Sequence, residues 1–211
     1  MQHIDLVRHG PVAGPAALYG WTDVALQQSS PACLNWLSTQ SYQHILSSPL
    51  QRCRQSAQQQ AERLQLNLLL EADLKEMNFG LWDGVPFDEQ SPYWPAQLQF
   101  WQQPFANTAP QGESLTDFQQ RVLQAFERHS SSQFDQQYEQ HQQALWLVHA
   151  GVIRILLASL LNIDLVQSHW LQHLRIAYGS VSRISRYNAQ SPWQIHCIAA
   201  PGFSFEQQDM K

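Results

Sequence analysis

Four side chains that could bind and attack a phosphate group come just after predicted strands of this chain. They are two guanidinium groups and two imidazoles: Arg8, His9, Arg52 and His149. Guanidinium groups bind phosphate oxygens through charge-assisted hydrogen bonds, and a neutral imidazole can attack phosphorus. The chain has 12 Lys and Arg residues, of which Lys75 and Lys211 are the lysines, so an anion site must be built from arginine. Taken singly, each of the four also fits a polar loop position, and it is the grouping that favours a phosphate site.

The elements that must position these side chains alternate between strand and helix. Short apolar or β-branched runs predict strands at 3–7, 44–47, 67–71, 144–148, 181–187 and 193–198. Helical composition and capping signals predict helices at 30–39, 49–66, 114–128 and 152–161. This order predicts a three-layer α/β/α sandwich with a mostly parallel central sheet. Ligands bind beyond the carboxyl ends of such strands, so we expect the four side chains at one edge of the sheet.

Composition bounds the class of protein. The chain has 211 residues, of which 44% are hydrophobic and 14% charged, and this predicts one folded domain over residues 1–211. The net charge of −5 argues against nucleic acid and membranes as partners, and no apolar run is long enough to span a bilayer. Cys33, Cys53 and Cys197 are odd in number, which favours a reducing, cytoplasmic compartment. A homodimer is left open.

Five segments resemble, in order, the sequence blocks of the histidine phosphatase superfamily, also called the phosphoglycerate mutase-like family. Their sequences are LVRHG (6–10), SSPLQRCRQSA (47–57), LKEMNFGLWDG (74–84), GESLTDFQQRV (112–122) and LVHAGVIR (147–154). One tripeptide would be weak support, but ordered blocks over residues 3–154 are specific. The resemblance implies a phosphoryl-transfer enzyme acting on a small-molecule phosphate ester. We expect no cofactor and no metal ion, because the arginine and histidine side chains supply the positive charge.

The resemblance also implies a role for each site residue. His9 would be the nucleophile that becomes phosphohistidine, and Arg8 and Arg52 would hold the phosphoryl oxygens. His149 would hold them from the opposite side. Glu76 would be the general acid that protonates the departing oxygen, a role typically worth ~10²–10⁴ in rate. Taken alone, Glu76 also fits a solvated loop glutamate.

The chain departs from the family pattern beside the nucleophile. Many members carry Thr and Asn after the His-Gly pair, whereas this chain reads PVAGP over residues 11–15. The segment LYGWTD at 18–23 still resembles the next family block, so we expect the backbone N–H of Gly20 to approach the phosphate. Ala150 stands where glycine is frequent.

The segment inserted at about 83–111 is expected to form a helical and aromatic lid that shapes specificity. It contains no Lys or Arg, so a diphosphorylated substrate would lack counter-charges and a hydrolase is favoured over a mutase. Large aromatic residues lie in this segment and directly before it: Trp82, Phe87, Tyr93, Trp94, Phe100, Trp101 and Phe105. These side chains could either stack on a flat leaving group or fill a hydrophobic lid.

The aromatic segment looks like the α-ribazole phosphatase branch, whose substrate, α-ribazole 5'-phosphate, belongs to cobalamin synthesis. The alternatives are a phosphoglycerate mutase, a protein phosphohistidine phosphatase and, in another class, a non-catalytic phosphate-binding module.

Overall fold

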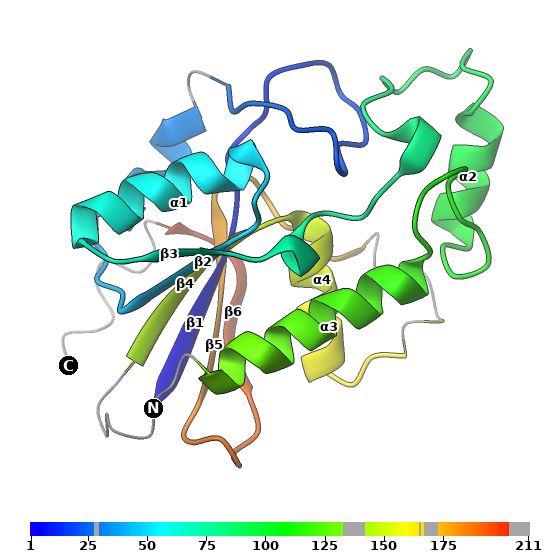
Figure 1. The fold of residues 1–211 in the computed structure, drawn as a ribbon. Coiled ribbons are helices and arrows are strands. Elements are labelled where there is room, and N and C mark those ends of the chain that lie inside the picture. The colour runs from blue at the N-terminus through cyan, green and yellow to red at the C-terminus, as the bar shows by residue number, and fades with distance from the viewer. Residues whose placement is uncertain (28–29, 133–141, 165, 167–172, 203–211) are drawn as a thin grey trace.

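The computed structural model describes residues 1–27, 30–132, 142–164, 166 and 173–202. At its centre is a six-stranded sheet with the order β3-β2-β4-β1-β5-β6 (Figure 1). The strands are β1 (Gln2–Arg8), β2 (His44–Ser47), β3 (Leu68–Leu70), β4 (Gln142–Val148), β5 (Ser180–Arg186) and β6 (Gln194–Pro201). Strands β3, β2, β4 and β1 pair in parallel, whereas β5 pairs antiparallel with both β1 and β6. The predicted mostly parallel sheet is confirmed.

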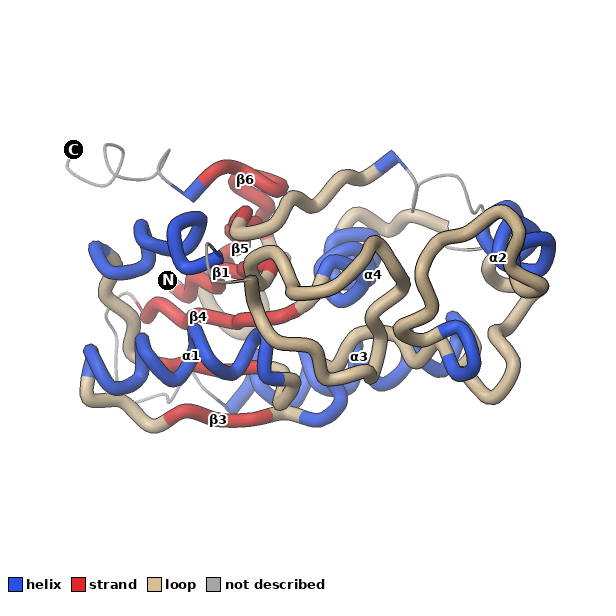
Figure 2. The backbone as a smooth tube through the Cα atoms, turned by 90° about the horizontal axis from the view of Figure 1, so that it is seen from above, coloured by secondary structure: helices blue, strands red, loops and turns tan. Residues whose placement is uncertain are grey.

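Helices cover both faces of this sheet, as the strand and helix alternation predicts (Figure 2). The α-helices are α1 (Gln51–Leu64), α2 (Trp94–Gln102), α3 (Leu115–Ser132) and α4 (Ala150–Leu160). Short 3-10 helices are η1 (Ser30–Thr39), η2 (Ala72–Leu74) and η3 (Gly80–Trp82). None of the helices in the described ranges combines the length and the apolar character that crossing a bilayer requires.

The central strands are buried on both faces, and their side chains feed two separate hydrophobic clusters. Leu145 and Leu147 of β4 point to the cluster formed with η1 and α1. Trp146 and Val148 point to the opposite cluster, formed with α3 and α4. Such burial explains why β4 reads as a continuous apolar run, which is typical of parallel strands covered by helices. The three-layer arrangement therefore follows from the sequence.

Two predicted elements differ in detail. The helix predicted at 30–39 is the 3-10 helix η1, whose last hydroxyls, on Ser38 and Thr39, donate to the carbonyls of Asn35 and Trp36. Such side-chain bonds compete with regular helical hydrogen bonding. The helix predicted to end near residue 128 continues to Ser132 as α3.

The segment 83–111 lies to one side of the sheet and contains α2, with irregular chain before and after it (Figure 1). Because of its prolines, the stretch 93–110 is predicted not to form one regular helix. In the structure α2 covers nine of its residues, and the others are not in an α-helix. Phe100 of α2 is 1% exposed and makes edge-to-face contacts with Phe79 and Trp82, at centroid distances of 6.4 and 5.8 Å. The helix is therefore attached to the main core through aromatic contacts.

Candidate active site

The carboxyl ends of β1 and β4 bring the two predicted histidines together. The register pairs Arg8 with Val148, so the next residue of each strand, His9 and His149, leaves the sheet at the same level. Their ring centroids are 5.2 Å apart. Arg52, in the first turn of α1 after β2, donates from Nε to His149 Nδ1 over 3.3 Å. The predicted sheet-edge cluster is therefore present.

His9 is held as a neutral imidazole with one free ring nitrogen. Its Nδ1 lies 2.7 Å from the carbonyl oxygen of Gly10, and because a carbonyl can only accept, Nδ1 carries the proton. The lone pair therefore lies on Nε2. Burial, followed by the charges of Arg52 and Arg8, lowers the pKa of His9 well below 6.5. A neutral imidazole with an available lone pair is the form that can attack phosphorus.

His149 is fixed in the opposite tautomer. Its Nδ1 accepts the hydrogen bond from Arg52, so the proton is on Nε2, which donates to Ser48 Oγ over 2.8 Å. Burial and the charge of Arg52 lower the pKa of His149 well below 6.5, so it too is neutral. Ser48 is fully buried and was not among the predicted site residues. Its signal in the sequence is its place between β2 and α1, directly before the Pro49 turn.

Arg52 is hydrogen-bonded to the backbone of the loop 18–23. The guanidinium donates to the carbonyl oxygens of Tyr19, Gly20 and Thr22 at 2.9, 2.6 and 2.9 Å. Gly20 thus faces the site with its carbonyl. Its N–H, predicted to approach phosphate, instead donates to Asp83 Oδ1 over 3.1 Å. That carboxylate also accepts hydrogen bonds from the N–H groups of Trp21 and Thr22. No sequence pattern predicts this role of Asp83.

Arg8 lies on the other side of His9. It donates from NH1 to the carbonyl oxygen of Ile176 at 2.6 Å, and its guanidinium carbon lies 3.7 Å from the ring centroid of Tyr178. The Tyr178 ring is also 5.6 Å from the His9 ring. Burial lowers the pKa of Arg8. The charges of Arg8 and Arg52 both act on the His9 imidazole, and two guanidinium groups near an imidazole suit the binding of a phosphoryl group.

The Glu76 carboxylate reaches the N-terminus of α4, the helix that begins directly after His149. Its Oε2 accepts the N–H of Gly151 over 3.0 Å, and Oε1 accepts the N–H of Met77 over 3.1 Å. A Cβ at position 151 would collide with Glu76 Oε1, so only glycine leaves room for this contact. The helix N-terminus thus places Glu76 beside the histidines.

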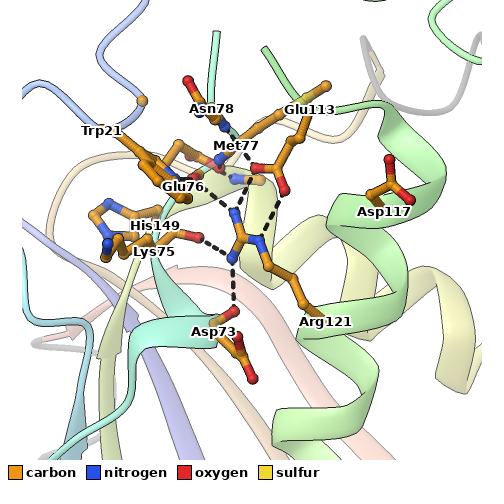
Figure 3. A network of polar contacts seen from close by, with 12 residues as sticks. Trp21, Asp73, Lys75, Glu76, Met77, Asn78, Glu113, Asp117, Arg121 and His149 are labelled. Atoms are coloured by element: carbon orange, nitrogen blue, oxygen red, sulfur yellow. Dashed lines mark hydrogen bonds and ion pairs between the residues drawn. The ribbon is translucent and has the colours of Figure 1, made fainter. Parts of the chain in front are cut away.

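Behind Glu76, Arg121 of α3 holds the backbone of the loop 71–79, which we call the acid loop (Figure 3). Arg121 donates to the carbonyl oxygens of Asp73, Lys75 and Glu76 at 2.7, 2.8 and 2.9 Å. It also makes a two-pronged ion pair with Glu113, at 2.9 Å from Nε and 2.6 Å from NH2. A guanidinium has five N–H groups, and each has an acceptor here.

Glu113 completes this contact from its own side. Its Oε1 also accepts the N–H of Asn78 over 2.6 Å, and its N–H donates to the Asn78 carbonyl over 3.1 Å. Glu113 and Arg121 both belong to the block 112–122 that resembles the family. No spacing within that block indicates that they contact the acid loop.

A cavity of about 300 Å³ opens beside Tyr178. Among the residues that the structure describes, its lining has no charged side chain and consists of Pro11, Val12, Gly14, Pro15, Ala16, Ala17, Tyr19, Gln27, Phe87 and Tyr178. Phe87 is the member of the predicted aromatic set that lines it. Trp82 and Phe100 are instead buried in the core, and Tyr93, Trp101 and Phe105 pack against that core. Most of the aromatic residues in this set therefore fill or pack against the hydrophobic core.

A family model and a bacterial relative match this chain over nearly its whole length, and a second relative matches part of it. The family model of the histidine phosphatase superfamily (branch 1) matches residues 4–199. The probable phosphoglycerate mutase GpmB of Yersinia pestis is 26% identical over 204 residues, covering 92% of this chain and 88% of that protein. The bifunctional protein Rv2228c of Mycobacterium tuberculosis is 37% identical over 84 residues, which are 40% of this chain. That match spans 23% of the mycobacterial protein.

Solved structures share the fold. A mycobacterial glucosyl-3-phosphoglycerate phosphatase with inorganic phosphate superposes with a TM-score of 0.80 and 21% identity, covering 96% of this chain and 99% of that one. The α-ribazole phosphatase from Shigella flexneri gives a TM-score of 0.76 and 24% identity, with coverage of 94% and 96%. The matched residues 4–199 contain every site residue described above, and the chain belongs to the histidine phosphatase superfamily, branch 1.

Proposed function

We propose that this protein is a phosphomonoester hydrolase that transfers the phosphoryl group of a small metabolite to His9. The observation that carries this proposal is the state of His9, a neutral imidazole with its Nε2 lone pair available between two arginines. The membership of the family is consistent with that chemistry.

The geometry supports a two-step reaction. In the first step His9 Nε2 bonds to phosphorus and the ester P–O bond breaks, while Glu76 in its acid form gives its proton to the departing oxygen. In the second step water attacks the phosphohistidine, Glu76 takes a proton from the water, and the N–P bond breaks to release phosphate and neutral His9. Arg8 and Arg52 stabilise the negative charge that the equatorial oxygens carry in both transition states.

Replacement of the nucleophile tests the proposal directly. We expect His9→Asn to lower release of phosphate from p-nitrophenyl phosphate below detection, because an asparagine side chain cannot accept the phosphoryl group in place of the imidazole. Inorganic phosphate should still bind to this variant, which shows that the site is intact. Wild-type activity should survive EDTA. Phosphate binding by the wild type without any turnover of phosphate esters would instead favour a non-catalytic binding module.

The role of Glu76 is tested by the basicity of the leaving group. We expect Glu76→Gln to slow an alkyl phosphate by ~10²-fold or more, because an alkoxide needs a proton to depart. In the first step, which kcat/KM reports, the same change should slow p-nitrophenyl phosphate far less, because p-nitrophenolate departs without a proton. Equal losses for both substrates would make Glu76 a pocket residue and not the acid.

The uncharged cavity bears on the class of substrate. Phe87 and Tyr178, 45% and 42% exposed, face it without an ionic partner in its lining. Such a surface suits a flat, uncharged leaving group, and the segment 83–111 has no Lys or Arg that could pair with a second phosphate. We therefore favour hydrolysis over mutase chemistry, with α-ribazole 5'-phosphate as the first substrate to test.

A panel of substrates separates the alternatives. Preferential hydrolysis of α-ribazole 5'-phosphate over 3-phosphoglycerate and over a phosphorylated histidine-containing domain would support the favoured assignment. Interconversion of 3- and 2-phosphoglycerate would support a mutase, and preference for the phosphorylated protein would support a protein phosphohistidine phosphatase.

A further inference from the structure

We propose that Arg121 and Glu113 form a positioning pair that aligns Glu76 for proton transfer. This inference rests on the proposed function, since it assigns the pair to the acid step of that reaction. Neither side chain need touch the substrate. Both act on the acid loop from the side opposite His149, as Figure 3 shows.

The contacts are concentrated on the residues that set the position of Glu76. Arg121 NH2 binds the Glu76 carbonyl, and NH1 binds the carbonyls of Lys75 and Asp73. Glu113 binds the N–H of Asn78, two residues beyond the acid. The pair therefore fixes the backbone on both sides of Glu76, and this backbone determines where the carboxyl group points.

The pair itself is well placed to hold a single geometry. Both side chains are 15% exposed, so solvent competes little with the ion pair. The planar guanidinium meets the carboxylate with two parallel hydrogen bonds and still has donors for three carbonyls. Lysine has three donors on a flexible stem and cannot reproduce this pattern.

The rest of the acid loop needs such support. The loop has no strand neighbour at Glu76. The side chains of Leu74, Met77 and Phe79 anchor it in the core, and Trp21 Nε1 also donates to the Glu76 carbonyl over 3.0 Å. The Glu76 carboxyl group is held on its other side by the single N–H of Gly151 and that of its own neighbour, Met77. Loss of the contacts behind the loop would therefore leave the direction of the acid poorly defined.

The pair can be tested by the same leaving-group comparison that identifies the acid. We expect Arg121→Gln to lower kcat/KM for an alkyl phosphate by ~10-fold or more beyond its effect on kcat/KM for p-nitrophenyl phosphate. Arg128→Gln is the matched control, because Arg128 lies on the same helix and binds Glu71 and Asp73 at the start of the same loop. We expect this control to leave the ratio of the two rates unchanged.

A double variant distinguishes positioning from a general loss of structure. If Arg121 acts through Glu76, the variant Glu76→Gln with Arg121→Gln should be as slow on the alkyl phosphate as Glu76→Gln alone. Additive losses, or equal losses on both substrates, would overturn the inference. If Arg121→Gln does not fold, Glu113→Gln supplies the same test, because it weakens the ion pair and keeps an acceptor for Asn78.

Failure of this inference can be told apart from failure of the proposed function. Failure of the wild type to form phosphohistidine would reject the reaction, whereas normal phosphohistidine with an unaltered leaving-group ratio in both pair variants would reject only the positioning role.

Discussion

The two halves of the site are built in different ways. The nucleophile half, His9, His149 and Arg52, comes from strand ends and the first turn of a helix, and each of these side chains is at most 6% exposed. The acid half is one carboxyl group on a loop, held in place by hydrogen bonds from Arg121 to backbone carbonyls. In the proposed reaction, buried side chains at the ends of regular elements therefore set where the phosphoryl group is attacked, and contacts to loop backbone set where the leaving group is protonated.

This difference has a measurable consequence. Damage to the nucleophile half should slow every substrate alike, because every phosphate ester needs the same phosphoryl transfer. Damage to the acid half should depend on the leaving group. The ratio of alkyl phosphate to p-nitrophenyl phosphate turnover therefore reports which half a substitution affects.

The largest such effect is expected at Arg52. We expect Arg52→Lys to lower kcat by ~10²–10³ for both substrates, a loss similar to that of an oxyanion donor. The ammonium cannot keep the hydrogen bonds to His149 and to the loop carbonyls at the same time. Arg54→Lys, at an exposed position of the same helix, is the control and should be neutral. A change in the substrate ratio with Arg52→Lys would contradict the division into halves.

A smaller and selective loss is expected at Gly151. In Gly151→Ala the new Cβ meets Glu76 Oε1 and lies 3.2 Å from Phe118 Cε1, so the carboxyl group must move. A misplacement of about 1 Å can cost ~10² in rate, and here the loss should appear with the alkyl phosphate. Steady-state kinetics on both substrates, with a melting curve to confirm folding, measures it. Equal slowing of both would place position 151 in the nucleophile half.

The smallest effect is a shift in titration. Burial and the charges of Arg52 and Arg8 lower the pKa of His9, so removing one charge should raise it back toward 6.5. We expect Arg8→Gln to raise the pKa and Arg8→Lys, which keeps the charge, to raise it less. The imidazole resonances of His9 followed by NMR over acidic to neutral pH provide the measurement. A lower pKa in Arg8→Gln would show that the charge of Arg8 does not act on His9.

The sequence predicts the nucleophile half well. Apolar runs mark the strands, and a residue that follows a parallel strand must lie at its carboxyl edge. Arg8, His9 and His149 are therefore placed by local pattern alone. To predict the position of Arg52, one must also know that the connection from β2 to α1 is short, and the sequence indicates this too.

The rest depends on contacts that no local pattern encodes. Arg121 is 45 residues from Glu76 along the chain, and its meeting with the acid loop depends on how α3 packs. The Gly20 N–H donates to Asp83, 63 residues away along the chain. It therefore does not approach the phosphate as the motif around it predicts. The aromatics of segment 83–111 illustrate the same limit, because composition cannot separate a ring that lines a cavity from one that fills a core.

The central claim is that His9 carries the phosphoryl group, and the most direct measurement is capture of that group. The protein would be mixed with ³²P-labelled p-nitrophenyl phosphate, quenched in denaturant within milliseconds and digested for peptide mapping. We predict label on the peptide that contains His9, stable to alkali and released by acid, absent from His9→Asn and enriched in Glu76→Gln, where attack by water is slowed. Turnover without such label, or label on another residue, would contradict the account.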